Sequence, residues 1–179
     1  MFFSHFVAIC VAGVATVGAL GALARSDTDP DVATLAGRAA DAHASLMRGD
    51  IARYRSAIEV TPDFTLMDPF GGQPTGAPAS DAHWERIGRF FREGRDARFE
   101  LIHAYRSADL VVLVANEHAH VAVGSLTAQD WSLRVTLVFR RDNGEWRLAH
   151  RHADPLVKGL TLEQAGRITL GRPEGEGNG

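Results

Sequence analysis

Apolar positions in residues 31–94 recur at helical spacing. Asp31 can cap a helix whose apolar side chains follow one face of a 3.6-residue period, namely Val32, Leu35, Ala39, Ala42, Leu46 and Met47. Gly49-Asp50 ends this helix, and a second, shorter helix is predicted over 51–58. Residues 64–67 are predicted to form a short strand that enters a turn at 68–72. A third helix is predicted to start at Ser80-Asp81 and to end near Gly94.

From Ala97 onward the period of the apolar pattern changes from 3.6 to two. Residues 97–105 alternate, and three further strand-like runs follow at 109–123, 130–141 and 145–153. Short connections between these runs favour antiparallel pairing. Three helices followed by a meander of strands predict an α+β fold in one domain.

The last hairpin allows a prediction of register. Asp142-Asn143-Gly144 suits a three-residue loop, which would pair Arg141 with Glu145. This register places the following residues on one face, which we expect to line a pocket beneath the helices: Arg134, Thr136, Val138, Trp146, Leu148, His150 and His152. The apolar residues Leu133, Val135, Leu137 and Phe139 occupy the opposite face and predict a homodimer interface. A two-residue loop would shift the register by one and mix the two sets.

Charge and cysteine content narrow the function class. The chain has 19 Lys and Arg against 22 Asp and Glu, a formal net charge of −3, which disfavours a general nucleic-acid binder. The one cysteine, Cys10, excludes an internal disulfide framework and a cysteine-based zinc cluster. His118 and His120 share a strand face, but nothing fixes a third ligand, and we expect neither a metal nor another cofactor.

The two ends of the chain differ from the middle. Residues 6–24 carry no charge and end in Ala22-Leu23-Ala24, so residues 1–24 are either a signal peptide or an N-terminal membrane anchor. Residues 25–30 are then a linker. The protein is accordingly expected to be exported, to the periplasm or outside the cell, or membrane-anchored; a wrongly assigned start codon would leave it cytoplasmic. Residues 158–179 are expected to form a C-terminal extension with a disordered tail.

Two groups of polar residues are candidates for chemistry. Asp68 follows the first strand, and an apolar pocket would raise the pKa of its carboxyl group toward the range that suits proton transfer beside a carbonyl; alternatively, Asp68 caps the turn before Pro69. His150 and His152, with Arg134 opposite, favour an anionic or carbonyl-bearing ligand, or are packing residues of a half-buried strand. The remaining candidate ligand contacts are Thr136, His103, Tyr105 and Trp84.

Two segments carry a family resemblance. LMDPFGGQPTG at 66–76 and VFRRDNGEWRLAHRH at 138–152, in this order of elements, resemble the nuclear transport factor 2-like superfamily, and within it the SnoaL-like and ketosteroid-isomerase-like proteins. The ending is also similar to the association domain of calcium/calmodulin-dependent kinase II. The resemblance covers about residues 31–157. It implies a cone-shaped fold, with three N-terminal helices packed on a strongly bent, mainly antiparallel sheet, an open apolar pocket and a dimer.

The resemblance also bears on function. Ketosteroid isomerases place a proton-shuttling aspartate in a turn similar to that of Asp68, but they add a tyrosine from the first helix, where this chain has Ala42 or His43. The kinase association domain has a pocket lined by arginine and histidine. Two hypotheses follow: a SnoaL-like small-molecule-binding homodimer, or an isomerase-, cyclase- or dehydratase-like enzyme. The enzyme would use Asp68 as its base, with His150 or Arg134 stabilising negative charge, and both Asp68 and His150 would face one cavity.

Overall fold

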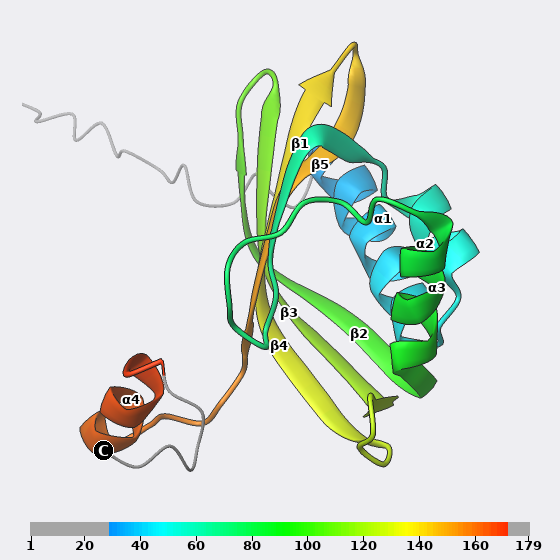
Figure 1. The fold of residues 1–179 in the computed structure, drawn as a ribbon. Coiled ribbons are helices and arrows are strands. Elements are labelled where there is room, and N and C mark those ends of the chain that lie inside the picture. Colours follow the sequence, from blue (N-terminus) through cyan, green and yellow to red (C-terminus); the bar gives the residue numbers. More distant parts are fainter. Residues whose placement is uncertain (1–28, 172–179) are drawn as a thin grey trace, which may run out of the picture.

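The protein forms one layer of helices against one curled sheet. The computed structural model describes residues 29–171, so the predicted leader and most of the predicted tail lie outside the described residues. The elements are, in order, α1 (Pro30–Met47), α2 (Ile51–Ala57), β1 (Val60–Met67), α3 (Asp81–Phe90), β2 (Phe91–Arg106), β3 (Leu110–Val123), β4 (Gln129–Asp142), β5 (Glu145–Pro155) and α4 (Leu162–Thr169). Helices α1 to α3 lie on one side of the sheet, and α4 stands apart on the other (Figure 1). The predicted α+β plan is confirmed.

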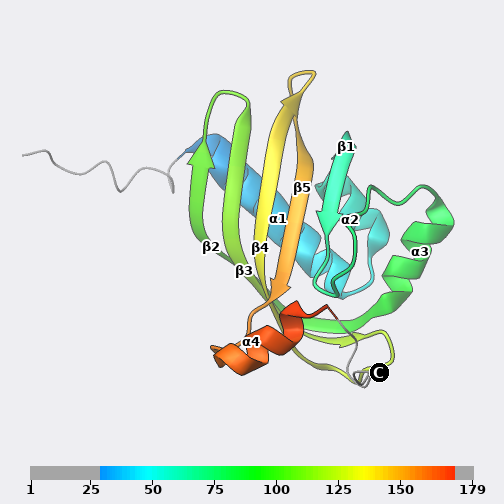
Figure 2. The same cartoon turned by 60° about the vertical axis from the view of Figure 1, so that its left-hand side comes forward.

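The sheet has five strands in the order β1-β5-β4-β3-β2. Only β1 runs parallel to its neighbour, β5, and the other pairs are antiparallel. Figure 2 shows the strands fanned across the helices. Strand β2 has several register shifts, and Glu93 and Asp96 adopt positive φ angles of 59° and 55° there. Such bulges bend a strand and increase its twist, which curls this end of the sheet around the helices.

The junction between α3 and β2 differs from the prediction. Helix α3 ends at Phe90 and β2 begins at Phe91, so Gly94 lies within a strand and does not end a helix. A side chain at Gly94 would overlap the backbone carbonyl of Met47, at the end of α1. Glycine here allows the strand to pass directly against the helix end, a tertiary contact that local sequence patterns do not encode.

The β4–β5 hairpin has the alternative register. Asp142 pairs with Glu145 around a two-residue loop, whose Asn143 and Gly144 have φ angles of 52° and 87°, as a type I′ turn requires. The predicted three-residue loop is therefore wrong. A β-bulge in β5 follows, since Phe139 pairs with Leu148 but its neighbour Val138 pairs with His150. The extra residue in β5 shifts the register back by one. Farther from the turn, Thr136 pairs with His152 and Arg134 with Asp154.

The two faces of the sheet are assigned opposite to the prediction. Leu137 and Phe139 are buried and share the main core with Val32 and Leu35 of α1. The apolar face proposed as a subunit interface is therefore the one that the helices cover. Arg134 and Thr136 point away from the helices, on what we call the outer face. The apolar stripe of α1 excludes water best against an apolar surface, and strand alternation alone does not tell which face receives it.

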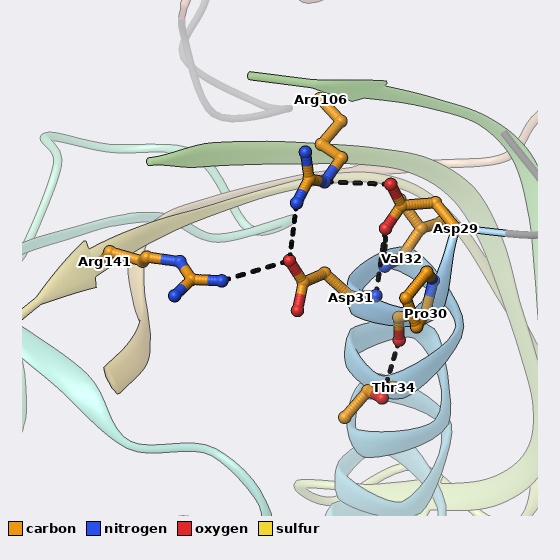
Figure 3. Close-up of polar contacts among 7 residues, drawn as sticks. All are labelled: Asp29, Pro30, Asp31, Val32, Thr34, Arg106 and Arg141. Carbon is orange, nitrogen blue, oxygen red and sulfur yellow. Dashed lines mark hydrogen bonds and ion pairs between the residues drawn. The ribbon is translucent and has the colours of Figure 1, made fainter. Parts of the chain in front are cut away.

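The start of α1 is tied to the strand ends by a charged cluster (Figure 3). Asp29 caps the helix, its carboxylate accepting hydrogen bonds from the backbone of Asp31 and Val32 at 2.9 and 3.2 Å. Arg106 of β2 contacts Asp29 and Asp31 at 2.9 and 2.8 Å, and Arg141 of β4 contacts Asp31 at 3.1 Å. The hydrogen bond from Arg106 is the main cause that holds the pKa of Asp31 below its ordinary value. The helix thus begins at Pro30, within the predicted linker.

The C-terminal extension contains a helix. Thr161 and Gln164 form a capping box at the start of α4. Leu162, Ile168 and Leu170 are largely exposed. None of the helices within residues 29–171 is long and apolar enough to cross a membrane.

Candidate functional site

A cleft of about 420 Å³ opens between α3, the end of α1, the turn after β1 and the near end of β4. We call it the α3 cleft. Its lining is predominantly apolar, with basic residues from α3 and β5 and one acid from the turn. The residues that line it include Leu46, Met47, Leu66, Asp68, Phe70, His83, Arg86, Ile87, Phe90, Phe91, Trp131, Leu133 and Arg151.

Helix α3 forms one wall of the cleft. His83, Arg86, Ile87 and Phe90 all line it, at the i, i+3, i+4, i+7 spacing that places residues on one helical face. Ser80 starts this helix by accepting a hydrogen bond from the backbone N–H of His83. His83 and Arg86 are exposed, so they stand at the rim, whereas Ile87 is half-buried.

The turn after β1 partly covers the cleft. Gly71 and Gly72 have φ angles of 84° and 91°, a conformation that favours glycine, and they reverse the chain there. The Phe70 ring reaches back to the rings of Phe90 and Trp131, with centroids 5.7 and 5.9 Å away. Phe70 is nevertheless 57% exposed, so this aromatic bridge lies at the surface of the cleft.

Asp68 is half-buried and lines the cleft. One carboxylate oxygen accepts a hydrogen bond from the backbone N–H of Phe70 at 2.9 Å, the contact expected of a residue that caps its own turn. Asp68 therefore both caps its own turn and lines the cleft, two roles that the sequence left as alternatives.

A buried ionic cluster lies behind the cleft. Arg151 of β5 donates two hydrogen bonds, of 2.9 and 2.7 Å, to the carboxylate of Glu117 on β3. His43 of α1 places Nδ1 3.4 Å from the same carboxylate and Nε2 3.0 Å from the backbone carbonyl of His118. The side chains of His43, Glu117 and Arg151 are 2%, 4% and 16% exposed. A two-point guanidinium–carboxylate contact fixes the orientation of both partners.

The charges within this cluster determine whether the carboxyl group of Glu117 is ionised. Burial acts to raise the pKa of its carboxyl group, but the Arg151 charge and the hydrogen bonds from His43 and Arg151 outweigh burial and hold the pKa well below its ordinary value. Glu117 is therefore ionised at neutral pH. The pKa of Arg151 is raised, because the attraction of Glu117 outweighs burial.

A second, inner cavity of about 20 Å³ lies beside this cluster. Tyr54 of α2 lines it together with His43, Glu117 and Arg151. Burial is the main cause that raises the pKa of the Tyr54 phenol, so the phenol is neutral over the physiological range. Arg151 lines both the inner cavity and the α3 cleft, so it connects the two spaces.

Most of the predicted ligand contacts lie together, but on the outer face. Two rows of paired residues cross the five strands: Tyr105, Val112, Val138, His150 and Thr65; and His103, Val114, Thr136, His152 and Met67. Arg134 belongs to a neighbouring row with Glu100, Asn116 and Asp154. The expectation that these residues line a pocket beneath the helices is wrong, because α1 covers the opposite face.

Asp68 and His150 are not brought together. His150 pairs with Thr65 of β1, and its Nδ1 lies 2.7 Å from the Thr65 hydroxyl on the outer face. The next β1 residue, Leu66, pairs with Arg151 and points into the cleft. Asp68, two residues beyond Leu66, lines the cleft as well. The basic β5 residue on the same side of the sheet as Asp68 is therefore Arg151.

Trp84 has a packing role. Its ring lies 5.9 Å from that of Tyr54, and the Arg55 guanidinium lies 5.3 Å from its centroid. It does not line the α3 cleft.

Glu117, Arg151, Tyr54, His83 and Arg86 are the site residues that sequence reasoning missed. Glu117 did leave a signal, because it occupies a buried position in the alternation of β3, between Ala115 and Ala119. A charged residue in a buried register requires a buried partner, and in the structure that partner is Arg151, which pairs with the buried Leu137.

Histidines on the outer face have individual partners. His118 Nδ1 lies 2.8 Å from the Ser132 hydroxyl, and His120 Nδ1 lies 3.0 Å from Asp130. Within residues 29–171, no three side chains of ligand type are arranged so that they could hold a metal ion.

Comparisons with known proteins agree with this architecture. The family model of the SnoaL-like domain matches residues 38–157. No curated protein matches the chain. Among solved structures, a protein described as a calcium/calmodulin-dependent protein kinase type II association domain, from Thiobacillus denitrificans, is 22% identical with a TM-score of 0.53, covering 72% of this chain and 95% of its own.

Two further structures have the same fold. A nuclear transport factor 2-like protein from Cytophaga hutchinsonii is 13% identical, with a TM-score of 0.56, and the match covers 72% of this chain and 99% of that one. A protein of the same superfamily from Streptomyces avermitilis, described as a dehydratase, is 17% identical with a TM-score of 0.56, covering 72% and 97%. The family model covers most of the chain, and the chain belongs to the SnoaL-like family, with the fold of nuclear transport factor 2-like proteins.

Proposed function

We propose that this protein binds a small, largely apolar molecule carrying an acidic or carbonyl group in the α3 cleft. The observation that carries the proposal is the position of Arg151 on the inner side of an apolar cleft whose rim adds Arg86 and His83. Ligand sites are typically apolar hollows of several hundred Å³ with a few polar groups that fix orientation. An anionic ligand is thus expected here as it was from the sequence, but the basic side chains proposed to bind it are Arg151, Arg86 and His83.

Calorimetry with a matched pair of probes tests this proposal. Phenylacetate and phenylacetamide have the same apolar body, and only the first is charged. We expect phenylacetate to bind at least about tenfold more tightly, because charge-assisted hydrogen bonds contribute about 1.5–3 kcal/mol. Equal affinities would assign the site to a neutral, carbonyl-bearing ligand, and no binding of either probe at millimolar concentration would contradict the proposal.

Matched variants locate the binding site. Phe70→Ala removes an exposed ring of the cleft and is expected to weaken phenylacetate binding, whereas Tyr105→Ala removes an exposed ring of the outer face and is expected to have no effect. In a second pair, Arg86→Gln in the cleft is expected to weaken phenylacetate binding, and Arg134→Gln on the outer face is expected to have no effect. Loss of binding in the outer-face variants alone would place the ligand on the other side of the sheet.

We also propose that the protein is a homodimer that associates through the outer face. Val112, Val114 and Val138 lie at the centre of the paired rows and are only half-buried in one copy. Ile102 and Tyr105 beside them are 54% and 61% exposed. A contiguous apolar strip with polar flanks suits a self-complementary interface.

An enzymatic function is the second candidate, and one feature favours it. Asp68 holds its carboxylate in the cleft with one oxygen committed to the Phe70 backbone, so the other oxygen can act as a base toward a bound carbonyl compound. A structural relative described as a dehydratase belongs to the same superfamily. Arg151, rather than His150, would then stabilise negative charge.

Proton exchange tests the enzymatic candidate without knowledge of the substrate. A base in the cleft is expected to exchange the α-hydrogens of phenylacetone for deuterium faster than buffer does, as followed by NMR. Asp68→Asn should remove the acceleration and Asp63→Asn, on the exposed part of β1, should leave it intact. Exchange at the buffer rate would remove this candidate.

A further inference from the structure

The turn after β1 is held together at its base. Leu66 and Thr75 exchange backbone hydrogen bonds of 2.7 and 2.9 Å, which join the two ends of the turn. The hydrogen bonds at the tip are local: the backbone N–H of Phe70 donates to the Asp68 carboxylate at 2.9 Å, and that of Gly71 to the Asp68 carbonyl at 3.4 Å. Movement of the tip therefore need not disturb the paired base.

One side chain of the tip joins two walls of the α3 cleft. The Phe70 ring contacts Phe90 of α3 edge-on and also contacts Trp131 of β4, with centroids 5.7 and 5.9 Å away. All three rings line the cleft. Phe70 is 57% exposed in this position, so the contacts that hold it are those of a ring lying mostly in water. Aromatic contacts of this kind are weak, and an arrangement without them is thermally accessible.

The residues beside Phe70 place the flexible joint on one side of it. Pro69, directly before Phe70, has a φ angle fixed by its own ring. Gly71 and Gly72, directly after it, have φ angles of 84° and 91° and open space where a side chain would lie. Glycine changes backbone conformation at the least cost, and a few such residues can absorb the rotation of a closing loop. The Phe70 ring is thus carried by a stiff dipeptide that can pivot on two glycines.

We propose that Phe70 is a gate of the α3 cleft. The turn pivots at Gly71 and Gly72, the ring leaves Phe90 and Trp131 so that a ligand enters, and the ring then returns over the ligand. This inference rests on the proposed function and adds how a ligand reaches the same site. Asp68 belongs to the same turn and its carboxylate is bonded to the Phe70 backbone, so opening moves the acid of the cleft together with the ring.

A gate has a kinetic signature that a simple contact lacks. If a ligand enters only while the ring is displaced, the association rate constant is reduced in proportion to the fraction of molecules in the open state. A ring that only contacts the bound ligand changes the dissociation rate constant alone. Phe70→Ala should therefore increase both rate constants, and should increase dissociation more than association because it also weakens binding.

A substitution at the pivot tests the gate without removing the ring. An alanine at Gly72 is strained at a φ angle of 91°, so Gly72→Ala disfavours the closed turn, although nothing lies within 4 Å of the added methyl group. Gly144→Ala is the matched control. Gly144 has a φ angle of 87° and the same open space, but it lies in the β4–β5 turn and does not line the cleft.

The experiment follows the binding of 4-fluorophenylacetate by ¹⁹F NMR, in which line shapes and relaxation over a titration give both rate constants. We expect association to accelerate at least severalfold in Phe70→Ala and in Gly72→Ala, and to stay unchanged in Gly144→Ala. An unchanged association rate constant in either of the first two variants overturns the inference. Equal acceleration in Gly144→Ala overturns it as well.

Failure of the proposed function gives a different result. If 4-fluorophenylacetate does not bind, the proposed function fails, and the gate is then tested in the protein alone by labelling with 5-fluorotryptophan. Trp131 reports on the Phe70 contact, and Trp84 is the internal reference because it packs against Tyr54 and does not line the cleft. A Trp131 signal that shifts in Gly72→Ala and not in Gly144→Ala supports the gate, and any other pattern overturns it.

Discussion

Arg151 and Glu117 join two strands of the sheet beneath α1 by two parallel hydrogen bonds of 2.9 and 2.7 Å. The pair connects the stability of the fold with the α3 cleft, because Arg151 lines that cleft and Glu117 lines the inner cavity. Its energetic role is open to direct measurement.

Removal of the Glu117 charge should be strongly destabilising. Glu117→Gln leaves the buried guanidinium of Arg151 without a counter-charge, and breaking a buried ion pair on one side costs about 3–5 kcal/mol. Urea denaturation followed by circular dichroism measures the loss. Glu100→Gln, an exposed carboxylate of β2, should change the free energy of unfolding by less than about 0.5 kcal/mol. Equal effects of the two substitutions would show that the cluster does not stabilise the fold.

Stability should depend on pH through the same carboxylate. Since the folded-state pKa of Glu117 lies below the ordinary value of 4.5, its contribution is complete above that value and is lost as the pH falls toward the folded-state pKa. Asp63, whose pKa the hydrogen bond from Arg140 lowers to about 2, acts in the same direction at the surface. We expect the midpoint of thermal unfolding to decrease from pH 5 to pH 2.5, and to decrease less in Glu117→Gln. An identical decrease in both proteins would assign acid sensitivity to other groups.

The close contact at Gly94 predicts that alanine substitutions at two glycines will have opposite effects on stability. Gly94→Ala would drive a methyl group into the Met47 carbonyl and should destabilise the protein by more than about 1 kcal/mol. Gly37→Ala lies in the middle of α1 with open space around it, and should stabilise by about 0.5–1 kcal/mol because alanine favours helix. Chemical denaturation of both variants checks the signs. A neutral Gly94→Ala would show that the α1 end does not constrain β2.

Charged substitutions on the two sheet faces should have different consequences. Val114→Lys places a charge on the half-buried outer face and is expected to give a folded monomer, as seen by light scattering combined with circular dichroism. Leu137→Glu places a charge in the main core and should unfold the protein, since Leu137 is 3% exposed within one copy. A folded, dimeric Val114→Lys protein would exclude the outer face as the interface. A folded Leu137→Glu monomer would restore the interface predicted from the sequence.

Helix and strand periodicity determined which elements this chain forms, because side chains on one side of an element must share one solvent environment. Val32, Leu35 and Ala39 thus predicted α1, and the alternation from Phe99 onward predicted the sheet. Asp68 was also placed correctly at the end of β1, since its turn chemistry is local.

Only the tertiary structure decided which sheet face the helices cover. The alternation of apolar and polar residues placed Leu137 and Thr136 on opposite faces of the sheet, but it was compatible with the helices covering either face. The β-bulge opposite Val138 and Phe139 depends on contacts outside the hairpin. The cluster of His43, Glu117 and Arg151 likewise brings together three elements distant in sequence, so no local pattern contains it. Secondary structure follows from short-range periodicity, whereas a buried charge cluster exists only once long-range packing has excluded water around it.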